Sequence, residues 1–208
     1  MKTLHLLLAA SAALLLSACG GSSSSSAVSP EGIGPVRLGA AITDLPRQCD
    51  GLYDTIDLEH YDGYYDDMNG EEVPAGDIFL FKKEGITLFQ TSIPENDRRI
   101  KWLYVLSPEL SYKGVHVGMS IAEAMKAGAR FYSAGDFASC GFYSCFKVDD
   151  SGIAFDYENN EMGEDAFSPA GNRKLDELPV EAGYSDMTAD DFAPQTVISA
   201  IRIEERIE

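Results

Sequence analysis

The chain has 208 residues, 45% of them apolar, and carries a formal net charge of −18 from 34 acidic and 16 basic side chains. This length suits one ordinary domain or two small ones that share a core. The charge argues against a nucleic-acid partner, because binding phosphates requires clustered Lys and Arg. It favours solubility, with a basic protein partner or bound cations as the alternatives.

The N-terminus has the pattern of an exported lipoprotein. After Lys2, the apolar run Leu4–Leu16 is shorter than the roughly 20 residues that span a bilayer, and it fits the core of a signal peptide. Residues 16–19 (LSAC) resemble a bacterial lipobox, which implies cleavage before Cys19 and diacylglycerol on its thiol. An ordinary signal peptide with an incidental Cys is the alternative.

A flexible, uncharged tether follows in Gly20–Ser26 (GGSSSSS). We therefore expect a signal peptide at 1–18, an acylated Cys and tether at 19–31, and a folded body from residue 32. Residue 20 is Gly rather than Asp, which by analogy with enterobacterial sorting favours the outer membrane. The predicted location is the periplasmic side of the outer membrane, with the lipid as the only membrane contact.

The body opens with Gly32–Gly39 (GIGPVRLG), in which Val36 and Leu38 lie at alternate positions and predict a short edge strand. A short helix is expected within Ala41–Leu52, with Thr43 as its cap.

The next segment, Asp54–Asp77, holds nine acidic residues and four Tyr or His, with little apolar periodicity. These features predict a surface loop. A Tyr-rich recognition surface is one alternative, since Tyr gives a large contact area at low entropic cost. A calcium site is the other, although the spacing does not match an EF-hand. The hard oxygen ligands available for it are Asp62, Asp66, Asp67, Asn69, Glu71 and Glu72.

Three β-rich runs then predict an antiparallel meander, in Ile78–Lys83, Gly85–Ser92 and Arg99–Ser107. The first two are joined by a hairpin turn at residues 83–85 (KEG). Trp102 in the third run is expected either to pack in the core or to stand on a ligand-facing surface of the sheet.

Lys113–Ala129 (KGVHVGMSIAEAMKAGA) predicts a strand, a glycine turn and a helix that begins with a capping box at residues 120–123 (SIAE). A weaker copy, Gly34–Leu45, lies 79 residues earlier, with Gly39 in the place of Gly118.

Two later runs, Ser139–Val148 and Gly152–Tyr157, resemble the first hairpin, and Thr196–Ile203 closes the body. Between them, Glu158–Gln195 is expected to be a long polar excursion with one helical turn near Ala189–Phe192. The last strand matches the third strand of the first meander at three apolar positions: Ile198, Ile201 and Ile203 with Ile100, Leu103 and Val105.

The predicted fold class is therefore α+β. Residues 32–110 and 111–208 each read as a strand, a short helix and a three-strand meander, in a tandem repeat that shares one globular body. Helices this short do not stand alone, so we expect them to pack on one face of an antiparallel sheet. The other sheet face is then free for a partner.

The mature chain has three cysteines beyond the anchor, and export permits a disulfide. We expect Cys140 to pair with Cys145 across a hairpin connection, with a bridge from Cys49 to one of them as the alternative. A redox or metal role is not expected, because there is no CxxC and the mature chain has only His60 and His116. His116, between two Val, is expected to be solvated or hydrogen-bonded.

Several short motifs together resemble the YfeY-like family of bacterial outer-membrane lipoproteins, which is of unknown function. They are GIG at 32–34, IKWLYVLSPEL running into KGVHVGMSIAEAM at 100–125, Cys145 before FKVDDSGIAFDY, and VISAIRI at 197–203. The resemblance implies an anchored periplasmic α+β domain and no reaction. Asp54–Asp77 and Glu158–Gln195 depart from the family pattern, so nothing is carried over to them. The helix-on-sheet plan is also similar to that of the secreted beta-lactamase inhibitory proteins and of the small lipoprotein of the barrel assembly machine, both protein binders.

No catalytic motif is present: the sequence lacks GxSxG, HExxH, a Walker loop and a Rossmann glycine pattern. We therefore expect a binding or assembly module without catalytic activity or a required cofactor. It would present a sheet face or the acidic Tyr-rich loop to an envelope protein. The alternative is a lipoprotein that binds a small molecule, a glycan or Ca²⁺.

Overall fold

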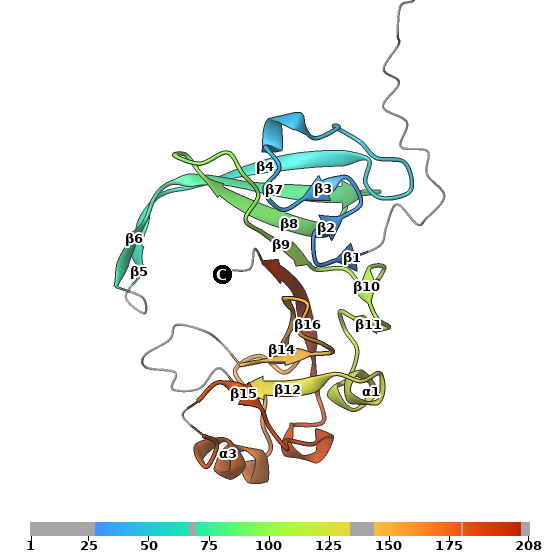
Figure 1. The fold of residues 1–208 in the computed structure, drawn as a ribbon, viewed down its shortest axis with the longest axis vertical. Helices are drawn as coiled ribbons and strands as arrows, with labels where there is room; N and C mark the ends of the chain where they lie inside the picture. The colour runs from blue at the N-terminus through green and yellow to red at the C-terminus, as the bar shows by residue number, and fades with distance from the viewer. Residues whose placement is uncertain (1–27, 67–69, 134–143, 180, 205–208) are drawn as a thin grey trace, which may run out of the picture.

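The centre of the molecule is an antiparallel sheet of nine strands in the order β15-β12-β13-β14-β16-β9-β8-β7-β4 (Figure 1). The structure is a computed structural model, and it describes residues 28–66, 70–133, 144–179 and 181–204. The strands of this sheet are β4 Thr55–Tyr61, β7 Gly76–Lys83, β8 Ile86–Pro94, β9 Trp102–Val105, β12 Arg130–Ser133, β13 Cys145–Lys147, β14 Ile153–Asn159, β15 Gly183–Tyr184 and β16 Thr196–Glu204.

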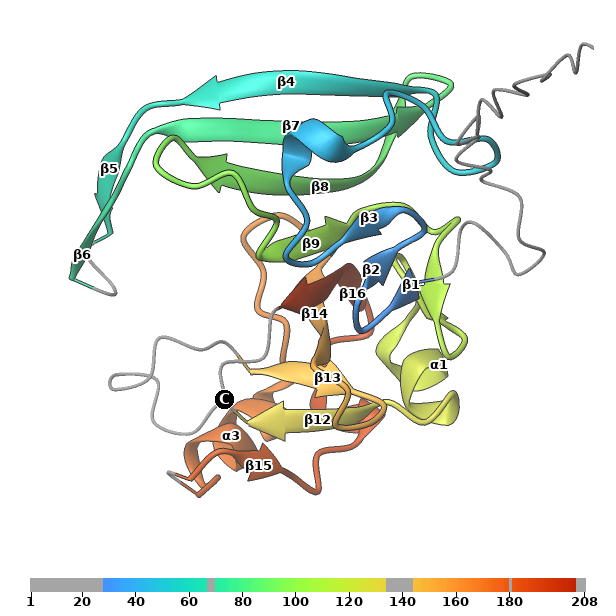
Figure 2. The ribbon, with the colours of Figure 1, turned by 45° about the horizontal axis from the view of Figure 1, so that its top comes forward.

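Short elements lie around the sheet, which curves between β4 at one end and β15 at the other (Figures 1 and 2). Three small ribbons accompany it: β1–β3 at Val28–Ser29, Gly32–Ile33 and Val36–Arg37; β5–β6 at Tyr64–Asp66 and Glu71–Val73; and β10–β11 at Ser111–Tyr112 and Val115–His116. The helical elements are η1 Ile42–Asp44, α1 Ile121–Lys126, α3 Pro169–Asp176 and η2 Ala189–Asp191. The first described element is β1, and its Val28 is buried in the core.

The predicted fold class, an α+β tandem repeat with helices packed on a sheet, is wrong. The described residues form a mainly β structure in which one large antiparallel sheet dominates and the helices are peripheral. The helix expected in Ala41–Leu52 shrinks to the 3₁₀ turn η1, whose N-cap residue Ala41 has no side chain that caps it. Pro46 lies two residues after the end of η1 and does not favour a longer helix.

The core is organised along one row of side chains that stand directly opposite one another on seven consecutive strands. Each is fully buried, and each is the register partner of the next. Direct cross-strand neighbours pack closely on one face of an antiparallel sheet, so the row joins all seven strands into one core. From β7 to β12 the row is Phe81, Phe89, Val105, Ile201, Phe155, Phe146 and Phe131.

The predicted meander is confirmed, since β7, β8 and β9 are neighbours in the sheet. The hairpin turn also forms where expected, with Glu84 at φ 51° and Gly85 at φ 80°. Two positive φ values are typical of the two-residue turn that matches the twist of a β-hairpin.

The expectation of a surface loop over Asp54–Asp77 is wrong. Seven of its residues form strand β4, which pairs with β7 from Thr55 opposite Lys82 to Tyr61 opposite Gly76. The period of two was present in the sequence TIDLEHY, but its outer face is acidic, so the apolar positions were too few to be conspicuous.

The correspondence between Gly39 and Gly118 appears as a repeated backbone contact. Gly39 N–H donates to the Ile100 carbonyl at 2.7 Å, and Gly118 N–H donates to the Ile198 carbonyl at 2.8 Å. Both glycines have a positive φ, 77° and 82°, which other residues rarely adopt. The capping box of α1 is also confirmed, because the Ser120 side chain accepts from the backbone N–H of Glu123 and the Glu123 side chain accepts in return.

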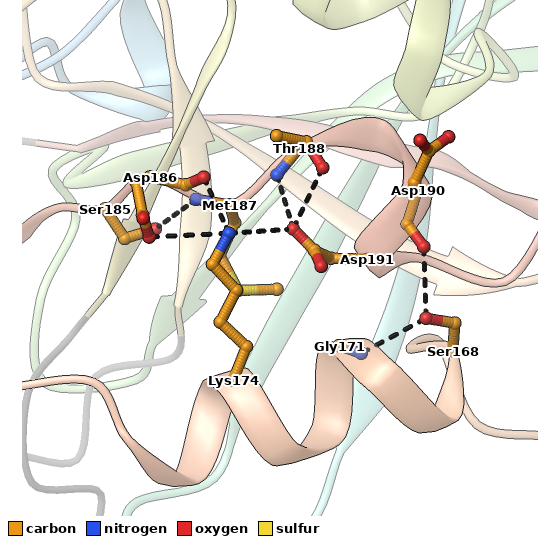
Figure 3. Close-up of polar contacts among 9 residues, drawn as sticks. All are labelled: Ser168, Gly171, Lys174, Ser185, Asp186, Met187, Thr188, Asp190 and Asp191. Atoms are coloured by element: carbon orange, nitrogen blue, oxygen red, sulfur yellow. Dashed lines mark hydrogen bonds and ion pairs between the residues drawn. The ribbon is translucent and has the colours of Figure 1, made fainter.

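The excursion Glu158–Gln195 contains the expected helical turn η2, and also a helix, α3, that was not predicted. Figure 3 shows how α3 is held. Ser168 Oγ accepts from the backbone N–H of Gly171 at 3.1 Å, and Lys174 Nζ lies 3.1 Å from Asp191 Oδ2. The sequence does contain a signal for this helix: Ser168 is a capping residue, and Pro169 follows it in the first turn.

The packed row makes a first prediction. We expect Phe155→Ala to lower the free energy of unfolding by about 3–5 kcal/mol, because it leaves a cavity between two fully buried neighbours. Met162→Ala is the control: Met162 is fully exposed, and its loss is expected to change stability by less than about 0.5 kcal/mol. Urea unfolding followed by circular dichroism measures both, and equal effects would contradict the role of the row.

Candidate functional site

The face of the sheet opposite the core carries polar and aromatic side chains at its centre. Trp102 lies here, half-buried, and its ring meets that of Tyr104 edge-on with centroids 5.1 Å apart. Leu103 and Val105, between and beyond them, point to the core and are fully buried. Of the two alternatives for Trp102, packing in the core is therefore wrong. Trp102 lies on the opposite face of the sheet.

Arg202 on β16 occupies the middle of this face, directly opposite Tyr104 on β9. Its Nη2 lies 3.3 Å from Asp156 Oδ1 and its Nη1 lies 3.2 Å from Glu204 Oε1, while its side chain is only 12% exposed. Burial raises the pKa of Asp156, and the attraction of Arg202 opposes that shift. The guanidinium is thus occupied within the sheet, apart from a buried Nε for which the structure gives no acceptor.

The end of the sheet opposite to β4 is formed by β15, a two-residue strand that pairs with β12 alone. The outer edge of β12 is covered by β15, with Tyr132 opposite Tyr184 and Ser133 opposite Gly183. Two cations lie over these tyrosine rings: Lys147 Nζ is 3.5 Å from the centroid of Tyr132, and the Arg130 guanidinium carbon is 4.4 Å from that of Tyr184. Two of the four residues of β12 thus have a backbone partner on their outer side, and both tyrosine rings have a cation over them.

The other end of the sheet, at β4, is open. In the part of the chain that the structure describes, β4 pairs with β7 on one side and with no strand on the other. Leu58 lies on the core side, opposite Phe79, and yet is 59% exposed, because the core does not extend beyond the last strand. Asp57 and Glu59 point to the opposite face and are exposed.

The charges along β4 are only partly compensated. Lys82 Nζ on β7 lies 2.6 Å from Asp57 Oδ2. His60 Nδ1 lies 3.1 Å from Asp77 Oδ1, and this hydrogen bond raises the pKa of His60 above 6.5. Glu59 forms no ion pair with any described residue. The edge therefore keeps a net negative potential next to an exposed apolar side chain.

The β4–β7 ribbon continues into an arm formed by β5 and β6, which projects from the sheet (Figures 1 and 2). Tyr64 and Tyr65 on this arm are 57% and 58% exposed. An open hollow of about 520 Å³ lies against them and is also lined by Val73, Pro74 and Asn96. The arm thus adds aromatic surface to the acidic edge. We use "acidic edge" below for β4 together with this arm.

Of the residues proposed for calcium, some lie on the arm or in the link that leads to it, and the others are outside the described residues. Asp62 is exposed in the link between β4 and β5, and Asp66 pairs in backbone register with Glu71. Asp67 and Asn69 are outside the described residues. Among the described residues, no group of three His, Cys, Asp or Glu is placed to hold a metal ion. The calcium site stays a prediction.

The lipidation and disulfide predictions also fall partly outside the description. Cys19 and Cys140 are not described, so both predictions stay untested. Cys145 is buried and has no disulfide partner among the described residues, and burial raises the pKa of its thiol to about 11. His116 Nδ1 lies 2.9 Å from the Val117 carbonyl O, which fits the expected hydrogen-bonded role. None of the described helices is both long and apolar enough to span a bilayer.

Comparison with known proteins finds no matching family model and no matching curated protein. The structure is similar to the crystal structure of the uncharacterized protein yfeY from Escherichia coli, at 15% sequence identity and a TM-score of 0.46. The match covers 86% of this chain and 99% of the other. This likeness assigns no function.

The Arg202 cluster makes a second prediction. Arg202→Met leaves the half-buried carboxylate of Asp156 without its cation, so we expect it to cost about 2–4 kcal/mol of unfolding free energy at neutral pH. The cost should shrink as the pH falls, because the folded state then gains a proton on Asp156, whose pKa is raised by burial.

Lys83→Met is the control for Arg202→Met, since Lys83 and Glu109 form an exposed pair at 3.8 Å that contributes little. Urea unfolding at several pH values measures both variants. A cost for Arg202→Met that does not depend on pH would contradict the role assigned to Asp156.

His60 on the edge strand makes a third prediction. We expect NMR titration to place its pKa above 6.5, and Asp77→Asn to lower it, since the Asp77 hydrogen bond is the largest cause of the shift. Asp57→Asn is the control, because Asp57 pairs with Lys82 instead. Any stability from the His60–Asp77 pair is present at pH values below 6.5 and is lost as the pH rises through the raised pKa. An unchanged His60 pKa in Asp77→Asn would refute the assignment.

Proposed function

We propose that this chain is a lipid-anchored module of the bacterial envelope that binds another envelope protein through its acidic edge and catalyses no reaction. The anchor is the acylated Cys19, on the periplasmic side of the outer membrane. One observation carries the proposal. The large sheet ends in a seven-residue strand, β4, that has no neighbour on its outer side among the described residues.

The chemistry of the acidic edge supports a protein partner. It combines an exposed aliphatic side chain, Leu58, with two exposed aromatic ones, Tyr64 and Tyr65. Tyr is enriched at the energetic centres of protein interfaces, because it buries a large area at low entropic cost. The acidic residues Asp57 and Glu59 lie beside this apolar surface, and such charges select a partner of opposite sign and accelerate its approach.

A small-molecule or glycan ligand is the second candidate, and the hollow at the arm favours it. Its volume, about 520 Å³, lies in the usual range for ligand sites. Tyr64 and Tyr65 line the hollow, and tyrosine rings are suited to stacking on a sugar or another flat ligand. Both candidates place the binding surface on the same part of the chain. They differ in whether a protein or a small molecule binds there.

Crosslinking and recovery of the lipidated protein from native envelopes tests the proposal. We expect Glu59→Lys and Leu58→Ala each to reduce recovery of a reproducible envelope-protein partner at least about fivefold, because one reverses the charge of the edge and the other removes its apolar contact. Two variants serve as matched controls and should leave recovery unchanged. Glu164→Lys changes an exposed glutamate outside the edge, and Ile86→Ala removes an aliphatic side chain that is 60% exposed, as Leu58 is 59% exposed.

Chelator is included in a parallel sample. A partner that is lost with chelator would move the calcium prediction for Asp62, Asp66, Asp67, Asn69 and Glu71 to the front. Equal loss in the edge variants and their controls would show that the acidic edge is not the binding surface. Absence of any partner would overturn the protein-binding proposal in favour of the small-ligand candidate.

A further inference from the structure

The two ends of the sheet occupy equivalent places in its strand order. β9 and β16 pair at the middle, with Leu103 opposite Ile203 and Val105 opposite Ile201. From this junction the order runs β9-β8-β7-β4 in one direction and β16-β14-β13-β12 in the other. β4 and β12 are therefore both the fourth strand from the junction. In each half the next strand of this sheet along the chain, β7 or β13, is the third strand from the junction and pairs with the fourth.

The two fourth strands differ at their outer edges and in their length. β12 carries a further antiparallel strand, β15, on its outer edge, whereas β4 carries none among the described residues. β4 is the longer of the two, with seven residues against four. The chain thus fills the fifth position at one end of the sheet with its own residues, and no residue that the structure describes fills the equivalent position at the other end.

The outer edge of β4 has the backbone chemistry for strand addition. In an antiparallel ladder, alternate residues direct their N–H and C=O groups to each side, so about half of the backbone polar groups of β4 face away from β7. Such a row of groups is a template for another extended chain. The burial pattern of β4 is consistent with an uncovered edge, since five of its seven residues are exposed.

The side chains of β4 specify the sequence that would fit beside it. Asp57 and Glu59 lie on one face and Leu58 between them lies on the other. An added strand places one residue directly opposite each of these. Basic residues opposite Asp57 and Glu59, with an apolar residue opposite Leu58, would pair the charges and extend the core over the exposed Leu58 and its neighbour Phe79.

A second copy of this chain is a poor occupant for the same reason. Two β4 strands paired antiparallel about Leu58 would place Asp57 of each copy opposite Glu59 of the other. Like charges directly opposite each other in a ladder are destabilising. The net charge of −18 adds repulsion between copies. The acidic residues thus discourage self-association while they select a basic strand.

We infer that the edge of β4 accepts an extended segment of a partner protein as a tenth strand, antiparallel to β4, with basic and apolar residues in alternation. This inference rests on the proposed function and specifies how the partner binds. β15 on β12 is the intramolecular counterpart of this interaction. The partner's backbone supplies the hydrogen bonds, and its alternate basic side chains meet Asp57 and Glu59.

A pair of synthetic peptides tests the inference on the full lipidated chain in detergent. The first is a ten-residue peptide of alternating Lys and Val, and the second is the same peptide N-methylated at alternate residues on the side that would face β4. N-methylation removes the N–H donors that strand addition needs and places a methyl group against β4, while the side chains and the charge stay the same. We expect the first peptide to bind and to slow hydrogen exchange at the β4 amides, and the second to bind roughly a hundredfold more weakly. Glu59→Lys should weaken binding of the first peptide about tenfold, and Glu164→Lys should not.

Each other outcome is decisive. Equal binding of the two peptides would overturn strand addition, while charge-directed binding at the acidic edge would stand. No binding of the unmethylated peptide to a chain that still recovers an envelope partner would overturn strand addition and leave the proposed function intact. Failure of both the peptide and the envelope recovery would overturn both. Protection at amides outside β4 would place the strand elsewhere and refute the inference.

Discussion

One row of seven fully buried side chains, from Phe81 on β7 to Phe131 on β12, is the contact on which the rest of the structure depends. The residues are register partners across seven strands, so a slip of one residue in any strand would turn its member of the row to the other face. The row therefore fixes registers as well as supplying buried area. It also determines where the core ends. Ile56 on β4 lies opposite Phe81, the first member of the row, whereas Leu58 on the same strand is mostly exposed to solvent.

The two faces of the sheet are stabilised by different interactions. The core face holds nearly all of the buried apolar area, and the opposite face holds Arg202 with its two carboxylates, which ties β16 to β14. At one end of the sheet the short strand β15 lies beside β12, and at the other the longer strand β4 has no further strand beside it among the described residues.

Much of this arrangement was predictable from local sequence, and the failures have physical causes. The meander, its turn at Glu84-Gly85 and the capping box at Ser120 were correct, because each is specified by a few neighbouring residues. The fold class was wrong, because short amphipathic runs do not reveal how many strands join one sheet. β4 was missed since its outer face is acidic. This edge became a candidate site only when the pairing of all strands was known, which is information that no local pattern contains.

The burial of Val28 limits how far the folded body can lie from a lipid on Cys19. Val28 is already packed in the core, so with Cys19 lipidated as proposed, only residues 20–27 separate the anchor from the folded body. A chain of eight residues spans at most about 29 Å when fully extended. With its lipid in the bilayer, the module would therefore keep Val28 within about this distance of the membrane surface and would diffuse in two dimensions. A partner would then have to come within one tether length and one body length of the membrane to meet the acidic edge.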